Sequence, residues 1–201
     1  MRDWWLRTLL VLQRPRPVFV ALRADSREEA GERSEQVLLI TWLAGIAVIL
    51  VDAADYLDES SRDWLDLAVW GFLAGGIYAF FGYFLLGGLL YACAKAFGSQ
   101  GTYRRSRHVL AFAATPIALS LVLWPVKLAL YGEDWFRTGG RDTGAGGLVF
   151  DLLFYGFLAW AAALLVIGVR AVHGWTVARA AAASAVALAA SIAIGLLLSR
   201  F

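Results

Sequence analysis

Five long apolar segments alternate with short polar connections along most of the chain. They cover approximately Gln36–Val51, Ala68–Phe97, Val109–Tyr131, Leu148–Val169 and Val177–Ser199. A helix needs roughly 17–25 apolar residues to cross the hydrocarbon core of a bilayer, and the last four segments reach that length. The pattern therefore predicts an all-α integral membrane helical bundle with five transmembrane helices, formed by residues 36–201.

The first apolar segment is the shortest. Its uncharged stretch, Gln36–Val51, falls just below the length of a membrane span, although Tyr56 and Leu57 continue the apolar pattern. A re-entrant segment at this position is the alternative, and it would leave four spans.

Residues 1–35 form a separate N-terminal segment that mixes apolar and charged positions. Four apolar residues fall near one helical face: Trp4, Trp5, Leu9 and Leu12. Pro15 and Pro17 end this pattern, which is typical of a short amphipathic helix at the membrane interface. A signal peptide is the alternative, but the apolar core is too short and no cleavage site of small residues follows.

Composition and charge support a membrane protein and orient it. The chain is 60% hydrophobic with a mean hydropathy of +0.65, whereas soluble domains are about 45–50% apolar. Of its Lys and Arg residues, thirteen lie before the first segment, in the second and fourth connections or in the adjoining ends of the segments, and four lie on the opposite side. The positive-inside rule therefore predicts a cytoplasmic N-terminus and a C-terminus outside. The single cysteine, Cys93, allows no intrachain disulfide.

Small residues at four-residue spacing predict close helix contacts in two segments. Helices pack in lipid where small side chains allow their backbones to approach. The second segment carries Gly71 and Gly75, with Ala79 and Gly82 continuing the same face, and the fifth carries Ala181, Ala185 and Ala189. Contacts within the chain are favoured, and contacts with a second copy remain open, so the oligomeric state is not predicted.

The third segment contains Thr115, Pro116 and Pro125 together with one charged residue, Lys127. Two prolines in one span predict helix breaks that neighbouring helices cover, which places this segment centrally in the bundle. Lys127 lies one turn from the outer end, and Asp151 lies at a comparable depth in the fourth segment. An intramembrane ion pair between them is the natural prediction. It would serve either as a polar site or as a structural link, and snorkelling of Lys127 to the interface is the further alternative.

Catalytic patterns are missing from the sequence. It holds no HExxH, no GxSxG and no His or Cys residues at metal-ligand spacing, so no catalytic, cofactor-binding or metal-binding residue is predicted. The glycine-rich stretch Gly139–Gly147 lacks the strand and the Lys-Ser/Thr of a phosphate loop, which favours a flexible tether. No nucleic-acid-binding module is present. Four basic residues of the second connection are expected to contact anionic lipid headgroups: Lys95, Arg104, Arg105 and Arg107.

The string FGSQGTYRRSRHVLAFAATPIAL, Phe97–Leu119, resembles the hinge and third span of the Yip domain family, the Ypt-interacting proteins, particularly its prokaryotic branch. Weaker similarities lie in RPVFVAL, Arg16–Leu22, and in GVRAVHGWTVARA, Gly168–Ala180. The resemblance covers nearly the whole chain. It implies a multi-pass protein of five spans with a cytoplasmic N-terminus.

The resemblance implies more about fold than about function. Eukaryotic members of the family associate with prenylated Rab-type GTPases in vesicle traffic. This chain lacks their DLYGP-like acidic aromatic motif, which argues against GTPase binding. Its Arg and Ala richness resembles a bacterial member and indicates the inner cell membrane. The family supplies no catalytic residue.

Two functions from different classes follow. The favoured one is a non-enzymatic membrane-organising factor of the Yip type that binds protein or lipid partners. The alternative is a small transporter or transporter subunit with a polar path past Lys127 and Asp151. An intramembrane enzyme is the least favoured.

Overall fold

The structure is a computed structural model that describes residues 2–24, 26–51, 64–132 and 144–198 of the 201-residue chain. Within these residues all regular structure is helical. In chain order the elements are α1 (Arg2–Gln13), α2 (Pro15–Ala21), α3 (Arg27–Val51), α5 (Trp64–Ala96), α6 (Tyr103–Ala113), α7 (Thr115–Leu119), the 3₁₀ turn η1 (Ser120–Val122), α8 (Leu123–Tyr131), α9 (Ala145–His173) and α10 (Val177–Leu198).

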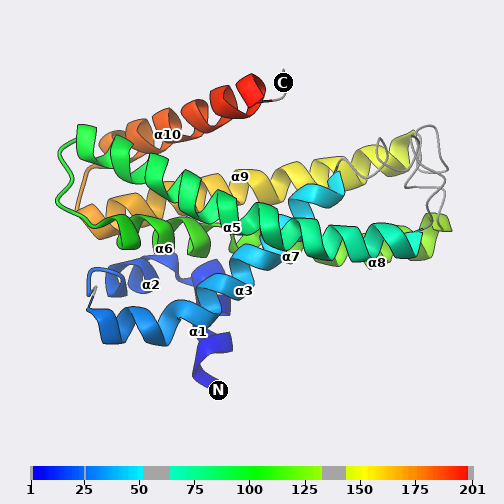
Figure 1. Ribbon diagram of the computed structural model, residues 1–201, viewed down its shortest axis with the longest axis horizontal. Helices are drawn as coiled ribbons and strands as arrows, with labels where there is room; N and C mark the ends of the chain where they lie inside the picture. The colour runs from blue at the N-terminus through cyan, green and yellow to red at the C-terminus, as the bar shows by residue number, and fades with distance from the viewer. Residues whose placement is uncertain (1, 25, 52–63, 133–143, 199–201) are drawn as a thin grey trace.

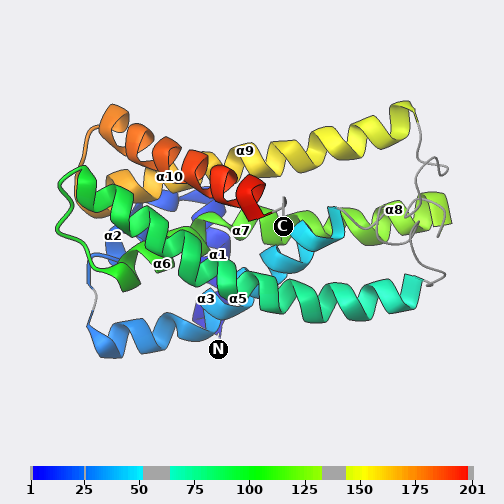
Figure 2. The ribbon, with the colours of Figure 1, turned by 45° about the horizontal axis from the view of Figure 1, so that its top comes forward.

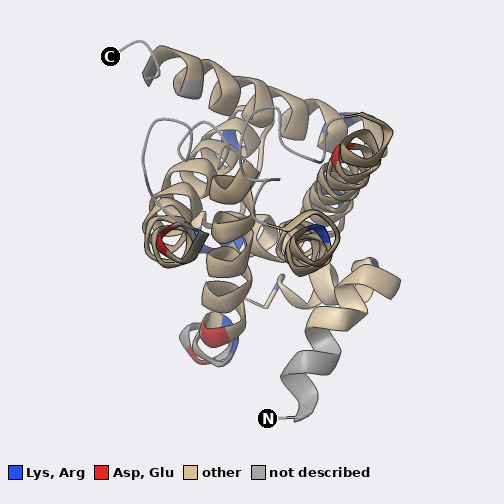
Figure 3. Cartoon of the chain, turned by 90° about the vertical axis from the view of Figure 1, so that its right-hand side faces the viewer, with Lys and Arg blue, Asp and Glu red and all other residues tan. Residues whose placement is uncertain are grey.

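Five stretches of the described residues are long and apolar enough to cross a membrane. They are Arg33–Val51, Ala68–Ala96, Tyr103–Tyr131, Ala145–His173 and Val177–Ile194. The predicted all-α membrane bundle is therefore confirmed. The first stretch reaches span length because α3 begins well before the uncharged residues, so charged and polar positions from Arg33 onward continue the same helix. Figure 3 shows how few charged residues interrupt the helices.

The long helices run side by side and define two ends of the molecule (Figures 1 and 2). We call the end that holds residues 97–102 and 174–176 the hinge end, and the opposite end, where α8 finishes and α9 starts, the distal end. In Figure 1, α2 and the first turns of α3 lie below α6, and α10 lies above α9. Tyr56 and Leu57, which continue the apolar pattern of the first segment, and residues 139–143 of the glycine-rich stretch lie outside the described residues.

The third span is divided into α6, α7, η1 and α8. Pro116 has no N–H, so it cannot bond the carbonyl of Phe112, four residues earlier. The hydroxyl of Thr115 donates to that oxygen instead, at 2.7 Å. Further along, the chain tightens into η1, where the fully buried Ser120 donates from Oγ to the carbonyl of Ile117 at 2.6 Å. Local hydroxyl groups thus satisfy carbonyls where the helix is interrupted.

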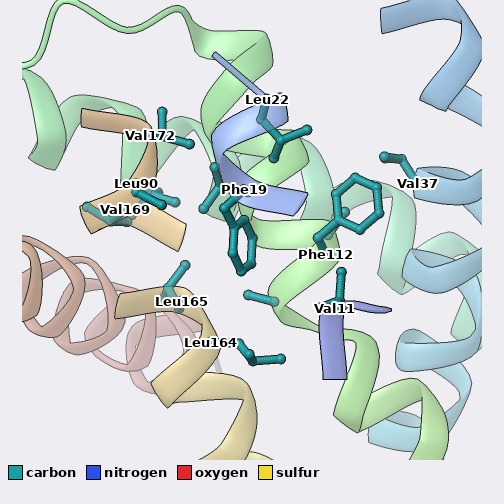
Figure 4. Close-up of a cluster of buried hydrophobic side chains, with 14 of the residues drawn as sticks. Val11, Phe19, Leu22, Val37, Leu90, Phe112, Leu164, Leu165, Val169 and Val172 are labelled. Atoms are coloured by element: carbon teal, nitrogen blue, oxygen red, sulfur yellow. The ribbon is translucent and has the colours of Figure 1, made fainter. Parts of the chain in front are cut away.

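The hydrophobic core lies near the hinge end and includes the N-terminal helices. Val11 of α1 and Phe19 of α2 are both 0% exposed, and Figure 4 shows them among side chains of α3, α6 and α9. Gly168 of α9 leaves the room for Phe19, because a Cβ there would lie 2.8 Å from Phe19 Cε1. Segment 1–35, read from the sequence as separate, therefore contributes to the same core as the spans.

Helices α3 and α5 cross closely through glycines of both. A Cβ on Gly75 would lie 2.6 Å from Ile46 Cα, and one on Gly71 would lie 3.1 Å from Leu50 Cδ2. Gly82, on the same helix, is more open, since the nearest such contact is Leu86 Cδ1 of α5 itself at 3.9 Å. The small residues of α5 therefore face α3 within this chain at Gly71 and Gly75.

Helix α10 buries a face beside the predicted alanine stripe. Ala181 is half-buried, and Ala185 and Ala189 are exposed. The buried positions are spaced by three and four residues: Ala180, Ala183, Ser184 and Ala187. With 3.6 residues per turn, this mixed spacing stays on one face, whereas a strict spacing of four drifts around the helix.

Candidate functional site

Arginine side chains hold the hinge end together by donating hydrogen bonds to main-chain carbonyls. Arg105 of α6 donates from Nε to the oxygen of Leu22 at 3.1 Å and from Nη2 to the oxygen of Arg23 at 2.6 Å. Arg23 in turn donates from Nε and Nη2 to the oxygen of Ala171, at 2.9 and 2.6 Å. The end of α2 is thereby tied to both α6 and the last turn of α9.

Two more arginines act in the same way. Arg33 of α3, 8% exposed, donates from Nη1 to Ala21 O at 3.1 Å and from Nη2 to Ala24 O at 2.7 Å. Arg179 of α10 donates from Nε to Phe97 O at 3.1 Å, and its Nη2 donates to the same oxygen. We call Arg23, Arg33, Arg105 and Arg179 the arginine junction.

The local structure explains why cations gather here. The carbonyls at the C-terminal end of a helix lack intrahelical partners and carry partial negative charge. Ala171 lies in the last turn of α9, and Ala21 is the last residue of α2. A planar guanidinium offers several donors in fixed geometry, so one arginine can satisfy two such carbonyls or grip one with two donors.

The two connections at the hinge end also contact each other. Nδ1 of His173 lies 3.2 Å from Oγ of Ser99, which accepts a hydrogen bond from the N–H of Gly101 at 2.9 Å. Gly101 approaches so closely that a Cβ there would lie 2.8 Å from Cε1 of His173. The imidazole stacks on Trp175, with ring centroids 4.6 Å apart, so the ends of α5 and α9 are locked together.

Arg107 of α6 lies among three aromatic rings. Its guanidinium carbon is 5.0 Å from the ring centroid of Tyr83 and 4.6 Å from those of Phe84 and Tyr103. The hydroxyl of Tyr103 donates to Phe84 O at 2.8 Å. A cation over aromatic faces is stabilised by the ring quadrupoles, so this contact fastens α6 to α5.

The four basic residues expected at lipid headgroups have different surroundings. Arg105 belongs to the arginine junction, and Arg107 lies in the aromatic cluster. Arg104 is half-buried in the first turn of α6. Lys95 is exposed in the last turn of α5, with Nζ 5.6 Å from the ring centroid of Tyr91. Contact of these residues with headgroups stays a prediction, and Arg105 and Arg107 already make several contacts with groups of the protein.

Lys127 and Asp151 both lie at the distal end. Nζ of the half-buried Lys127 is 5.8 Å from the ring centroid of Phe150, the residue before Asp151. Tyr131 packs edge-on against the same Phe150 ring, with centroids 6.1 Å apart. Aromatic contacts thus bring the end of α8 to the start of α9. The side chain of Asp151 is exposed, and its pairing with Lys127 stays a prediction.

Sequence reasoning missed most of the arginine junction. Arg23, Arg33 and Arg179 were counted only as orientation signals. For Arg23 the usable signal was its position, two residues after the end of a short helix that begins with Pro15. Among the described residues, no group of three or more His, Cys, Asp or Glu side chains is placed to hold a metal ion.

A comparison with known families completes this picture. The model of the Yip1 domain matches residues 9–199. The chain belongs to the Yip1 domain family. The match begins at Leu9, so this Yip1 domain takes in α2 and all of α3 together with the later spans. No curated protein and no solved structure matches the chain.

Proposed function

We propose that this Yip1-domain protein is a non-enzymatic membrane-organising factor that binds other membrane proteins through its distal half. The carrying observation is an uneven distribution of burial along the spans. In α9 the buried positions, apart from Gly147, begin only at Ala161, and α8 has no buried residue. In α8 and in the first half of α9 the apolar side chains therefore lie mostly on the surface, whereas the later turns of α9 pack into the core.

These apolar side chains form what we call the distal face, made of Val126, Leu130, Leu148, Leu152 and Tyr155. Leu130 and Tyr155 are both 65% exposed, and Leu152 is 61% exposed. Lipid tails are as apolar as leucine, so helix faces in a membrane associate by close packing with a partner rather than by hydrophobic drive. A rigid core with open distal helices supports a protein that binds partners in the membrane. The alternative of a small transporter gains no support from the family match.

Site-specific photo-crosslinking in native membranes tests this proposal. We expect benzoylphenylalanine at Tyr155 to give a discrete protein adduct, identified by mass spectrometry. The matched control is the same probe at Ile192 of α10, which is 64% exposed but lies outside the distal face. An adduct with a second copy of the chain would make the partner this protein itself. Equal labelling at both positions, or lipid adducts alone at Tyr155, would contradict the proposal.

We further propose that the protein lies in the cell membrane with its hinge end and N-terminus in the cytoplasm. The uneven distribution of Lys and Arg supports this orientation. In a Cys93→Ala background, a membrane-impermeant maleimide should label Thr138→Cys in intact cells. It should label Arg14→Cys only after the membrane is opened. The reverse pattern would overturn the orientation.

A further inference from the structure

A pocket of about 380 Å³ lies between α2 and the last turn of α9 at the hinge end. Its lining combines three arginines with apolar side chains: Arg16, Val20, Arg23, Ile167, Arg170, Ala171, Gly174 and Trp175. The volume falls at the lower end of the range of small-molecule sites, roughly 300–1,000 Å³. It suits a compact headgroup rather than a whole lipid or a peptide.

Among the described residues, no acidic side chain neutralises the positive charge of this pocket. None of the lining residues is acidic. Arg16 and Arg170 are exposed, and no described carboxylate is ion-paired with either of them or with Arg23. Like charges gathered in one pocket repel each other. An anion bound among them would turn that repulsion into attraction.

The chemistry of the three cations points to a phosphate. Guanidinium groups bind phosphate oxygens with paired hydrogen bonds. Arg23 is held in place, because its Nε and Nη2 both donate to Ala171 O, so paired hydrogen bonds to a phosphate would come from Arg16 and Arg170. A fixed arginine loses little side-chain freedom on binding, so the pocket is partly organised before the anion arrives.

The position of the pocket along the bundle favours a lipid headgroup, rather than free phosphate, as the source of the phosphate. The span Ala145–His173 ends at the pocket, and the lining Trp175 lies two residues beyond its end. Tryptophan is enriched at the height of lipid headgroups, and Val20, Ile167 and Trp175 supply apolar walls for the part of a lipid next to its phosphate. The cytoplasmic leaflet, where the proposed orientation places this end, is rich in anionic lipids.

We propose that the pocket lined by Arg16, Arg23, Arg170 and Trp175 binds the headgroup phosphate of an anionic phospholipid. This assignment rests on the proposed orientation in the membrane, and it goes beyond the proposed partner binding by naming a lipid ligand at the hinge end. The site lies at the opposite end of α9 from Asp151 and the distal face. Lipid binding and partner binding are therefore separable by mutation.

Native mass spectrometry of the full-length protein, released from detergent, tests the site with phosphatidylglycerol as the probe. Phosphatidylglycerol should bind the wild type more tightly than phosphatidylcholine. The double variant Arg16→Gln with Arg170→Gln should bind it about tenfold or more weakly, since each basic residue near a headgroup contributes to the attraction. Arg23 is left unchanged because it also holds α2 to α9.

The matched control is Arg14→Gln with Arg137→Gln, which removes the same charge from positions that do not line the pocket and that are not among the residues expected at lipid headgroups. It should keep wild-type affinity, and circular dichroism should show that both double variants are folded. Equal affinities of the two double variants, or equal binding of phosphatidylcholine, would overturn the proposal. Displacement of the lipid by 10 mM inorganic phosphate would assign the pocket to free phosphate and overturn the lipid source.

Failure of this site is distinguishable from failure of the proposed function. Benzoylphenylalanine at Tyr155 should give the same protein adduct in the Arg16→Gln, Arg170→Gln background, because the distal face is untouched. If the adduct persists while phosphatidylglycerol binding shows no dependence on the arginines, only the lipid assignment is wrong. If the lipid result holds and the adduct is never formed, the proposed partner binding is wrong.

Discussion

Replacing Phe19 with alanine is expected to lower the free energy of unfolding by about 3–5 kcal/mol, the usual cost of emptying a fully buried phenylalanine site. The ring is 0% exposed and lies where α2 meets α6 and α9. The cavity should persist, because the arginine junction holds the end of α2 at Ala171 and Arg105 and hinders collapse of the helix into the space. The measurement is reversible unfolding in mixed micelles as the fraction of dodecyl sulfate rises.

The matched control is Phe81→Ala on α5. It removes the same atoms, but its side chain is 67% exposed on the helix surface, so we expect a loss of well under 1 kcal/mol because no cavity forms. Equal losses for the two variants would mean that α2 is not part of the core.

A double mutant tests the contact between Phe19 of α2 and Gly168 of α9. Gly168→Ala alone should cost about 1–3 kcal/mol, as overpacking does, since its Cβ would lie 2.8 Å from Phe19 Cε1 and 2.9 Å from Val109 Cγ1. In the Phe19→Ala background the contacts of the added methyl with the Phe19 ring are gone, the contact with Val109 remains, and the methyl fills part of the void. The two changes should therefore cost less together than their separate costs added, because contacting residues couple.

The membrane spans could be predicted from the sequence, because their composition and length are dictated by the lipid that surrounds them. Because a lipid bilayer requires long apolar helices, the five spans followed from hydropathy and length alone. Even there, α3 was underestimated, since Arg33 is buried by bonding to the carbonyls of Ala21 and Ala24 rather than by lying in an apolar run. In the sequence, the charged Arg33 looks like a residue exposed to solvent.

The arrangement at the hinge end could not be predicted in this way. Each arginine of the junction reaches a carbonyl far away in sequence, as Arg23 does to Ala171, and main-chain carbonyls leave no mark on the residue type. The pocket with Arg16 and Arg170 arises from the same long-range approach of α2 to α9. The count of Lys and Arg residues from which the orientation is predicted therefore includes the arginines of the hinge end. The count does not indicate that these arginines lie close together.

The Yip1 match and the burial pattern give the same view of the N-terminal helices. Residues from Leu9 onward belong to the family domain, and Val11 and Phe19 are buried with the spans. The sequence favoured an interfacial helix here because the apolar residues share one face. A face of that kind buries equally well against a protein core, and periodicity alone does not say which surface covers it.

At the crossing of α3 and α5, helix propensity and packing predict opposite effects on stability when Gly45 is replaced by alanine. Alanine forms helices better than glycine by about 0.8–1 kcal/mol, so propensity alone would make Gly45→Ala stabilising. In the structure, a Cβ on Gly45 would collide with the main-chain oxygen of Gly75 and lie 2.5 Å from Ala79 Cβ. These atoms belong to the backbone and a short side chain of α5, so they cannot rotate away.

We therefore expect Gly45→Ala to push the two helices apart and lower the free energy of unfolding by roughly 2 kcal/mol or more, since overpacking outweighs propensity. The control is Gly82→Ala on α5, whose added Cβ has no such contact closer than 3.9 Å. It should be neutral or slightly stabilising in the same dodecyl sulfate titration. If Gly45→Ala is stabilising to the same degree, propensity decides at both positions, and the two helices do not cross at Gly45 and Gly75.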